Sequence, residues 1–148
     1  MKNKTLAAWL AFVGGPLGLH RFYLHGPGDT LGWLLPIPTA IGLYGFQRVQ
    51  EHGIDDPLSW VLLPVLGFTF AGCALTAIVY GLMDAARWNA RFNPGAPEDA
   101  AAGRTRWATV FAVVLSLLVG TTVLMASIVY GFQRYFEWQV EEGRKISQ

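Results

Sequence analysis

Two long windows of the sequence contain no charged residue. The first runs from Leu58 to Met83 and the second from Trp107 to Phe132, and each is 26 residues long. As a helix rising about 1.5 Å per residue, either window is about 39 Å long, which exceeds the ~30 Å hydrocarbon core of a bilayer. A soluble protein would have to surround both helices with further layers, and 148 residues are too few for that. Both windows are therefore predicted to be transmembrane helices.

The composition excludes several other classes of protein. Hydrophobic residues make up 53% of the chain and charged residues 14%, against about 25% charged in an ordinary soluble domain. An intrinsically disordered chain is excluded, because it needs low hydrophobicity and high charge. A formal net charge of +1 argues against a nucleic-acid partner, since such proteins carry a basic patch. The single cysteine, Cys73, excludes a disulfide framework.

The first half of the chain contains two shorter apolar segments. Residues 5–19 and 30–47 are uncharged, and each is close to the minimum length that spans a bilayer. We expect them to form a short hairpin joined at residues 25–29, a stretch with two glycines and a proline. Pro36 and Pro38 free backbone groups that need protein or water as partners inside a membrane. Four transmembrane helices are expected, and three plus a re-entrant second segment is the alternative.

The sequence thus indicates an all-α, multi-pass integral membrane protein. We expect a hairpin domain over residues 1–50, a polar loop at 51–57, a second transmembrane hairpin over 58–133 with a connector at 84–106, and a tail over 134–148. With four crossings the Lys and Arg residues divide six to five between the two sides, which decides nothing under the positive-inside rule. The two N-terminal lysines favour termini in the cytoplasm.

The C-terminal tail is predicted to be an amphipathic helix at the membrane interface. Its apolar and charged residues fall on separate helical faces. The apolar face holds Phe132, Tyr135, Phe136 and Val140, and the charged face holds Glu137, Glu141 and Lys145. A helix that binds a partner protein is the alternative interpretation.

Small residues recur at a four-residue spacing on both long helices. Such stripes let membrane helices approach closely, so we expect the two helices to pack through them. The predicted packing residues are Gly72, Cys73, Thr76, Ala77, Gly81, Ala108, Ala112, Ser116 and Gly120. Contact between copies in an oligomer is the alternative use.

The sequence predicts no catalytic, cofactor-binding or metal site. His20 and His25 lie five residues apart, with no Glu or Cys that completes a zinc ligand set. No glycine-rich phosphate loop and no serine nucleophile motif occurs. The two long windows also lack the ionisable groups that coupled transporters place inside the membrane. An enzyme and a coupled transporter are both disfavoured.

One stretch near the N-terminus resembles the TM2 domain. A lysine-rich start and a short apolar helix precede Gly-Pro-Leu-Gly-Leu-His-Arg-Phe-Tyr-Leu at residues 15–24. The family signature is Gly-x-x-Gly-x-(His/Asp)-Arg-Phe-Tyr-Leu-Gly, and here His25 replaces its last glycine. The resemblance covers about residues 2–50. It implies a small membrane protein of a kind widespread in bacteria, in the cytoplasmic (inner) membrane, and it assigns no reaction.

Our leading hypothesis is a non-catalytic scaffold or interaction module for membrane proteins or lipids. The candidate interaction motif comprises His20, Arg21, Phe22 and Tyr23, which would act as an interfacial recognition surface or a structural clamp. The expected partners are the lipid bilayer and either a membrane protein or a second copy of the chain, without nucleic acid or cofactor. The alternative is a passive channel or small-solute permeation unit formed by an oligomer, and an enzyme ranks third.

Overall fold

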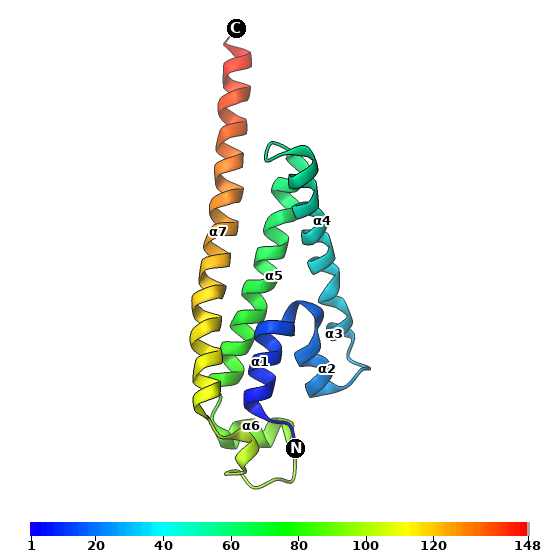
Figure 1. Ribbon diagram of the computed structural model, residues 1–148, viewed down its shortest axis with the longest axis vertical. Helices are drawn as coiled ribbons and strands as arrows, with labels where there is room; N and C mark the ends of the chain where they lie inside the picture. Colours follow the sequence, from blue (N-terminus) through cyan, green and yellow to red (C-terminus); the bar gives the residue numbers. More distant parts are fainter. Residues whose placement is uncertain (148) are drawn as a thin grey trace.

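The computed structural model describes residues 1–147 as helices joined by loops, with no strand in that range (Figure 1). The all-α fold class is confirmed. The elements in chain order are α1 (Lys4–Gly14), the 3-10 turn η1 (Gly15–Leu17), α2 (Leu19–His25), α3 (Thr30–Leu34), α4 (Pro36–His52), α5 (Pro57–Leu82), α6 (Ala85–Phe92), the 3-10 turn η2 (Ala101–Gly103) and α7 (Trp107–Ile146).

Helices α5 and α7 correspond to the two uncharged windows. Both are long and apolar enough to cross a membrane, and only 22% and 17% of their most apolar stretches are buried within the chain. A core helix of a soluble protein would be mostly buried, so these exposed apolar faces are typical of a membrane protein. Two candidate spans are thus present, and the expected count of four is not confirmed.

The first 25 residues form a hairpin of their own. Helix α1 runs away from the N-terminus, η1 reverses the chain, and α2 returns (Figure 1). The backbone N–H of Asn3 donates to the Tyr23 hydroxyl over 2.7 Å, and Lys2 Nζ donates to the Leu24 carbonyl. Gly18 makes the reversal with a φ of +75°, which only glycine adopts at low cost. Both ends of this hairpin therefore lie at one end of the bundle.

This arrangement differs from the expected one in the first half of the chain. The apolar segment over residues 5–19 is interrupted by η1, and residues 25–29 lie beside the N-terminus rather than at the opposite end. The two prolines do not prevent residues 30–47 from forming helices, α3 and α4. Pro36 is the first residue of α4, where its missing N–H has no intrahelical partner to lose. Helices α3 and α4 consequently run to the far end of the bundle.

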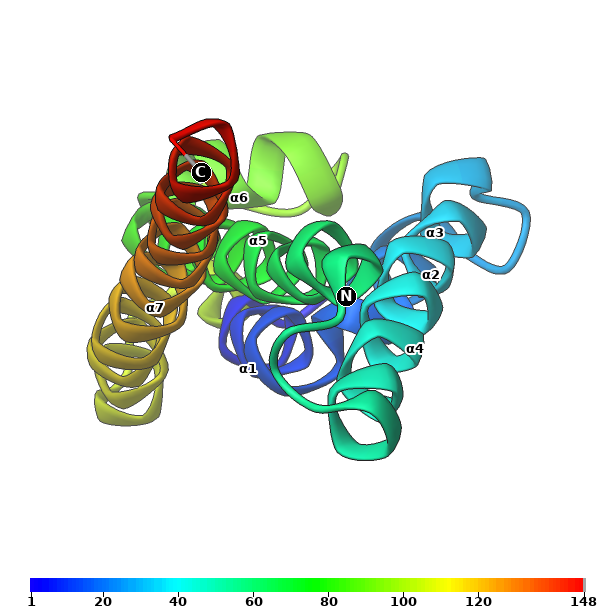
Figure 2. The same cartoon turned by 90° about the horizontal axis from the view of Figure 1, so that it is seen from above.

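Helix α5 forms the centre of the bundle. Seen from above, α4 and α7 lie on either side of it and α1 lies against a third side (Figure 2). The chain turns sharply after α5 because Met83 is extended and the Asp84 side chain caps α6 by accepting the Arg87 N–H over 2.7 Å. Ala85 to Phe92 therefore forms a separate short helix, α6, that lies below α1 and α5 in Figure 1.

The segment from 84 to 106 closes the N-terminal end of the bundle. Trp88 is fully buried, and its Nε1–H donates to the Lys2 carbonyl over 2.9 Å. The Lys4 ammonium is also fully buried and donates to the Met83 carbonyl and to Thr105 Oγ1, both over 2.7 Å. These bonds hold the hairpin onto the segments that follow α5 and precede α7.

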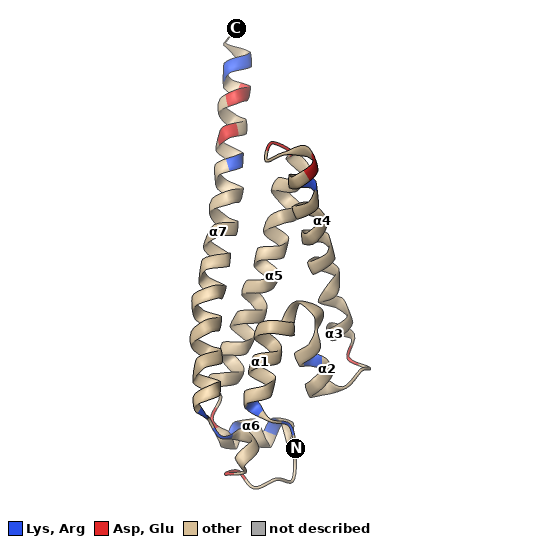
Figure 3. Ribbon diagram, in the orientation of Figure 1, with Lys and Arg blue, Asp and Glu red and all other residues tan. Residues whose placement is uncertain are grey.

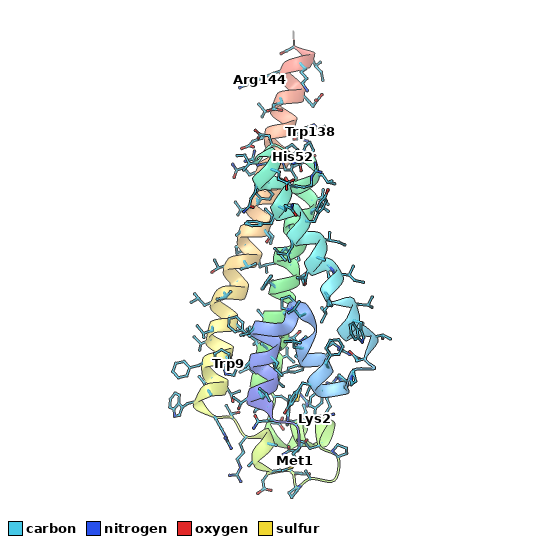
Figure 4. The ribbon with its side chains drawn as sticks, turned by 45° about the vertical axis from the view of Figure 1, so that its right-hand side comes forward. Met1, Lys2, Trp9, His52, Trp138 and Arg144 are labelled. Carbon is cyan, nitrogen blue, oxygen red and sulfur yellow. The ribbon has the colours of Figure 1, made fainter. Side chains whose placement is uncertain are left out.

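Residues 134–146 of the expected tail are helical and form the last part of α7. Helix α7 continues without a break to Ile146 and extends past the ends of α4 and α5, so that Trp138 and Arg144 lie beyond His52 (Figure 4). Arg134 Nη1 donates to Asp55 Oδ1 over 3.1 Å, which ties α7 to the loop between α4 and α5. We call the part beyond this bond, residues 135–146, the arm.

Candidate functional site

His20 on α2 lies inside the bundle. Its side chain is 3% exposed, and its ring centroid is 6.1 Å from that of Tyr80 on α5. Its Nδ1 is buried and has no hydrogen-bond partner among the described residues. A buried imidazole nitrogen without a partner is unusual, because desolvating a polar atom costs free energy.

Arg21 closes the connector between α2 and α3. Its Nε and Nη2 donate to Asp29 Oδ2 and Oδ1 over 2.5 and 3.0 Å. Asp29 Oδ2 also accepts the Gly32 N–H over 2.8 Å and so caps α3. The hydrogen bonds from Arg21 lower the pKa of Asp29 to about 2. This bidentate pair fixes the angle at which the chain leaves the hairpin.

Phe22 and Tyr23 also make contacts within the chain. The Phe22 ring lies 5.1 Å from that of Trp33 and fills the space next to Gly32, where a Cβ would stand 2.6 Å from Phe22 Cε1. Tyr23 accepts the Asn3 N–H described above. The four residues of the candidate motif thus face α5, α3 and the N-terminus, and they do not form one exposed patch.

Some predicted packing residues lie between α5 and α7. A Cβ at Gly120 would stand 2.6 Å from the Cβ of Ala74, and one at Gly81 would stand 2.3 Å from Val113 Cγ2. Such distances show that both glycines lie where the helices approach most closely. Ala77, Ala112 and Ser116 are buried as well.

The other predicted packing residues have different neighbours. Cys73 packs against Gly15 of η1, where a Cβ would stand 2.5 Å from Cys73 Cβ. Ala108 is exposed, and its carbonyl accepts the Trp9 Nε1–H over 3.0 Å. Gly72 and Thr76 face a groove between α5 and the N-terminal helices.

This groove is the hollow next to the motif. Its volume is about 490 Å³, within the range of roughly 300–1,000 Å³ that ligand pockets occupy. His20 and Arg21 line it from α2, and apolar side chains line it from α3, α4 and α5. No group of His, Cys, Asp or Glu within residues 1–147 is arranged to hold a metal ion.

A second copy of the motif follows 27 residues after the first. Residues 15–33 and residues 42–60 both fit the pattern Gly-x-x-Gly-x-(His/Gln)-Arg-x-x-x-His-Gly-x-x-Asp-x-Leu-x-Trp. Gln47 takes the place of His20, and every other specified residue is identical in the two copies. The copies occupy the two ends of the α3–α4 segment.

The two copies have the same local structure. Arg48 donates to both carboxylate oxygens of Asp56 over 2.8 and 2.7 Å, and Asp56 caps α5 through the Ser59 N–H at 3.0 Å. These bonds lower the pKa of Asp56 to about 2. Each copy ends its first helix at a glycine with positive φ, +87° at Gly26 and +85° at Gly53.

The tryptophans complete the likeness. Trp33 Nε1 donates to the Pro27 carbonyl over 2.8 Å and Trp60 Nε1 to the Ile54 carbonyl over 3.1 Å, six residues back in both cases. We call each Arg–Asp–Trp arrangement a corner. Reasoning from the sequence missed the second corner, although the spacing of these residues was sufficient to find it.

The N-terminal part of the chain, which contains the first corner, is similar to known proteins. The family model of the TM2 domain matches residues 1–46. A protein of Bacillus subtilis (strain 168), described as "Uncharacterized membrane protein YozV", is 39% identical over 62 residues, which cover 37% of this chain and 78% of that protein. The chain belongs to the TM2 domain family. No solved structure matches it. The resemblance predicted from residues 2–50 is confirmed, and the chain is a membrane protein with a TM2 domain.

Proposed function

We propose that this TM2 protein is a non-catalytic membrane scaffold whose arm holds another membrane protein. The observation that supports this most directly is the arm itself, which continues α7 past the ends of α4 and α5 (Figure 4). Its apolar face, which begins at Phe132 just before the arm, is strongly exposed, with Phe132 at 61%, Phe136 at 57% and Val140 at 55%. A face of this kind at i, i+4 and i+8 is a typical helix-pairing surface.

The scaffold crosses the bilayer three times in this proposal. Helices α3–α4, α5 and α7 each run the length of the bundle, whereas α1 and α2 enter and leave at the same end as a re-entrant hairpin. Backbone that is irregular at membrane depth is tolerated when protein surrounds it, and η1 packs against α5. Three crossings place the N-terminus and the arm on opposite sides.

The charges favour the N-terminal end as the cytoplasmic one. Acidic and basic residues gather near the two ends of the bundle (Figure 3). The N-terminal end holds seven of the eleven Lys and Arg residues, namely Lys2, Lys4, Arg21, Arg87, Arg91, Arg104 and Arg106. The other end holds Arg48, Arg134, Arg144 and Lys145. The division of six to five under four crossings becomes seven to four under three, and the positive-inside rule then gives an orientation.

Epitope tags at the two termini test the topology. In intact cells, an impermeant protease should reach the C-terminal tag and leave the N-terminal tag intact. Four crossings would put both tags on one side, and this result would refute the re-entrant hairpin.

Photo-crosslinking from the arm tests the partner. A photoreactive phenylalanine analogue at position 136 should give an adduct in the native membrane, and the same analogue at position 145, on the opposite, charged face, is the matched control. The adduct should be with another membrane protein, identified by mass spectrometry and recovered through its own tag. An adduct with a second copy of the chain, or equal yields from both positions, would contradict the proposal.

A further inference from the structure

The groove beside α2 has a polar wall on α2, and its other sides are lined mostly by apolar side chains. Leu31, Leu34 and Phe68 are half-exposed at its rim, and in a membrane these side chains meet lipid. The groove therefore opens sideways to the bilayer. An occupant that enters from this direction must carry an apolar chain.

The polar wall has hydrogen-bonding capacity that the chain itself does not use. His20 Nδ1 is buried and has no hydrogen-bond partner among the described residues. The His20 side chain is only 3% exposed. A guanidinium has five N–H donors, and Asp29 accepts from two atoms of Arg21, so other Arg21 donors are available. Arg21 is still 24% exposed at the side chain. The wall is suited to bind a lipid headgroup that offers several hydrogen-bond acceptors, such as a phosphate diester.

The end of the bundle that holds this wall is positively charged. Its seven Lys and Arg residues outnumber the four acidic residues there, Asp29, Asp84, Glu98 and Asp99. An excess of cations close to a membrane surface attracts anionic lipids.

We propose that the groove binds one anionic phospholipid, with its phosphate at His20 and Arg21 and an acyl chain between α3–α4 and α5. The second corner lacks this capacity because Gln47 replaces His20 and its amide donates to Glu51 over 2.8 Å. The lipid site rests on the proposed membrane placement and not on the partner that the arm holds.

The test uses the full chain in phosphatidylcholine vesicles that contain a minor fraction of phosphatidylglycerol with a photoreactive acyl chain. Cross-links should map to the peptides around Leu31–Leu34 and Phe68–Thr76, and unlabelled phosphatidylglycerol should compete. The variant His20→Leu should lower labelling about tenfold, because it removes a hydrogen bond to a charged group. The matched variant at the second corner, Gln47→Leu, should leave labelling unchanged.

A second variant keeps the test independent of the buried histidine. A Cβ at Gly72 meets nothing within 4 Å, so Gly72→Leu fills the groove without a clash and should also lower labelling about tenfold. Gly131→Leu is its control, since Gly131 is equally open and lies on α7.

The outcomes separate the lipid site from the scaffold. Phosphatidylcholine carries the same phosphate diester but no net charge, so equal labelling by a photoreactive phosphatidylcholine would refute the preference for an anionic phospholipid. Unchanged labelling in Gly72→Leu would refute the groove as the site. The yield of the cross-link from position 136 of the arm is measured in the same variants. If it persists while lipid labelling shows no dependence on the groove, the lipid site is wrong and the scaffold proposal stands.

Discussion

Replacing Gly42 by alanine should destabilise the contact between α4 and α5. A Cβ at this position would stand 2.4 Å from Leu66 Cβ, 2.6 Å from Leu66 N and 2.7 Å from Leu66 Cα. Ordinary contact begins at 3.4 Å, so the helices must separate by about 1 Å. Two of these three atoms belong to the backbone and cannot rotate away, which places the cost in the upper half of the ~1–3 kcal/mol typical of overpacking.

Alanine also favours a helix over glycine by about 1 kcal/mol, and this gain must be separated from the clash. Gly131→Ala provides the control, because a Cβ there meets nothing within 4 Å. The unfolding free energy of both variants is measured by SDS titration of mixed micelles, followed by circular dichroism. We expect Gly42→Ala to be less stable than Gly131→Ala by roughly 2–3 kcal/mol. Equal stability of the two variants would refute the close approach of α4 and α5 at this glycine.

Three further predictions concern the corners, the N-terminal end and permeation. The pKa values of Asp29 and Asp56 are lowered from 3.8 to about 2, so the stability they contribute is present above pH ~4 and is lost as the pH falls towards 2. The melting temperature should decline over that window, and an Asp29→Asn, Asp56→Asn double variant that declines equally would contradict this. Lys4→Met leaves the two acceptors of its buried ammonium without a donor and should reduce the unfolding free energy by about 1–3 kcal/mol, as measured in the same SDS titration. A passive channel would give solute flux through vesicles containing the purified chain. We expect flux no higher than in empty vesicles, and a higher flux would support the permeation hypothesis over the scaffold.

The length of the uncharged windows was sufficient to predict α5 and α7, but it did not predict the hairpin of α1 and α2 at the start of the chain. Residues 5–19 are uncharged over a length near the minimum for a crossing, which favours a single segment. Glycines 14, 15 and 18 within this stretch nevertheless permit the chain to reverse there. It also took Pro36 as a helix breaker, whereas the structure uses Pro36 to begin α4.

The contacts of the motif were beyond the reach of the sequence. The Tyr23 hydroxyl accepts the backbone N–H of Asn3, twenty residues earlier. Every residue except proline has a backbone N–H, so the type of residue does not reveal such a partner. The pairing of Arg21 with Asp29 was accessible in principle, because Arg48 and Asp56 repeat the same spacing. The repeat is not apparent as a contiguous stretch of similar sequence, because its identical residues are separated by variable ones.

The corners have a consequence for how the chain is inserted. Eight identical residues build the same turn at both ends of the α3–α4 segment. The turn can therefore form on either side of the membrane. The direction of insertion must then be encoded outside the corners, in the cations of residues 2–4 and of the segment from 84 to 106. Moving those charges to the arm should invert the protein as a whole while both turns stay intact.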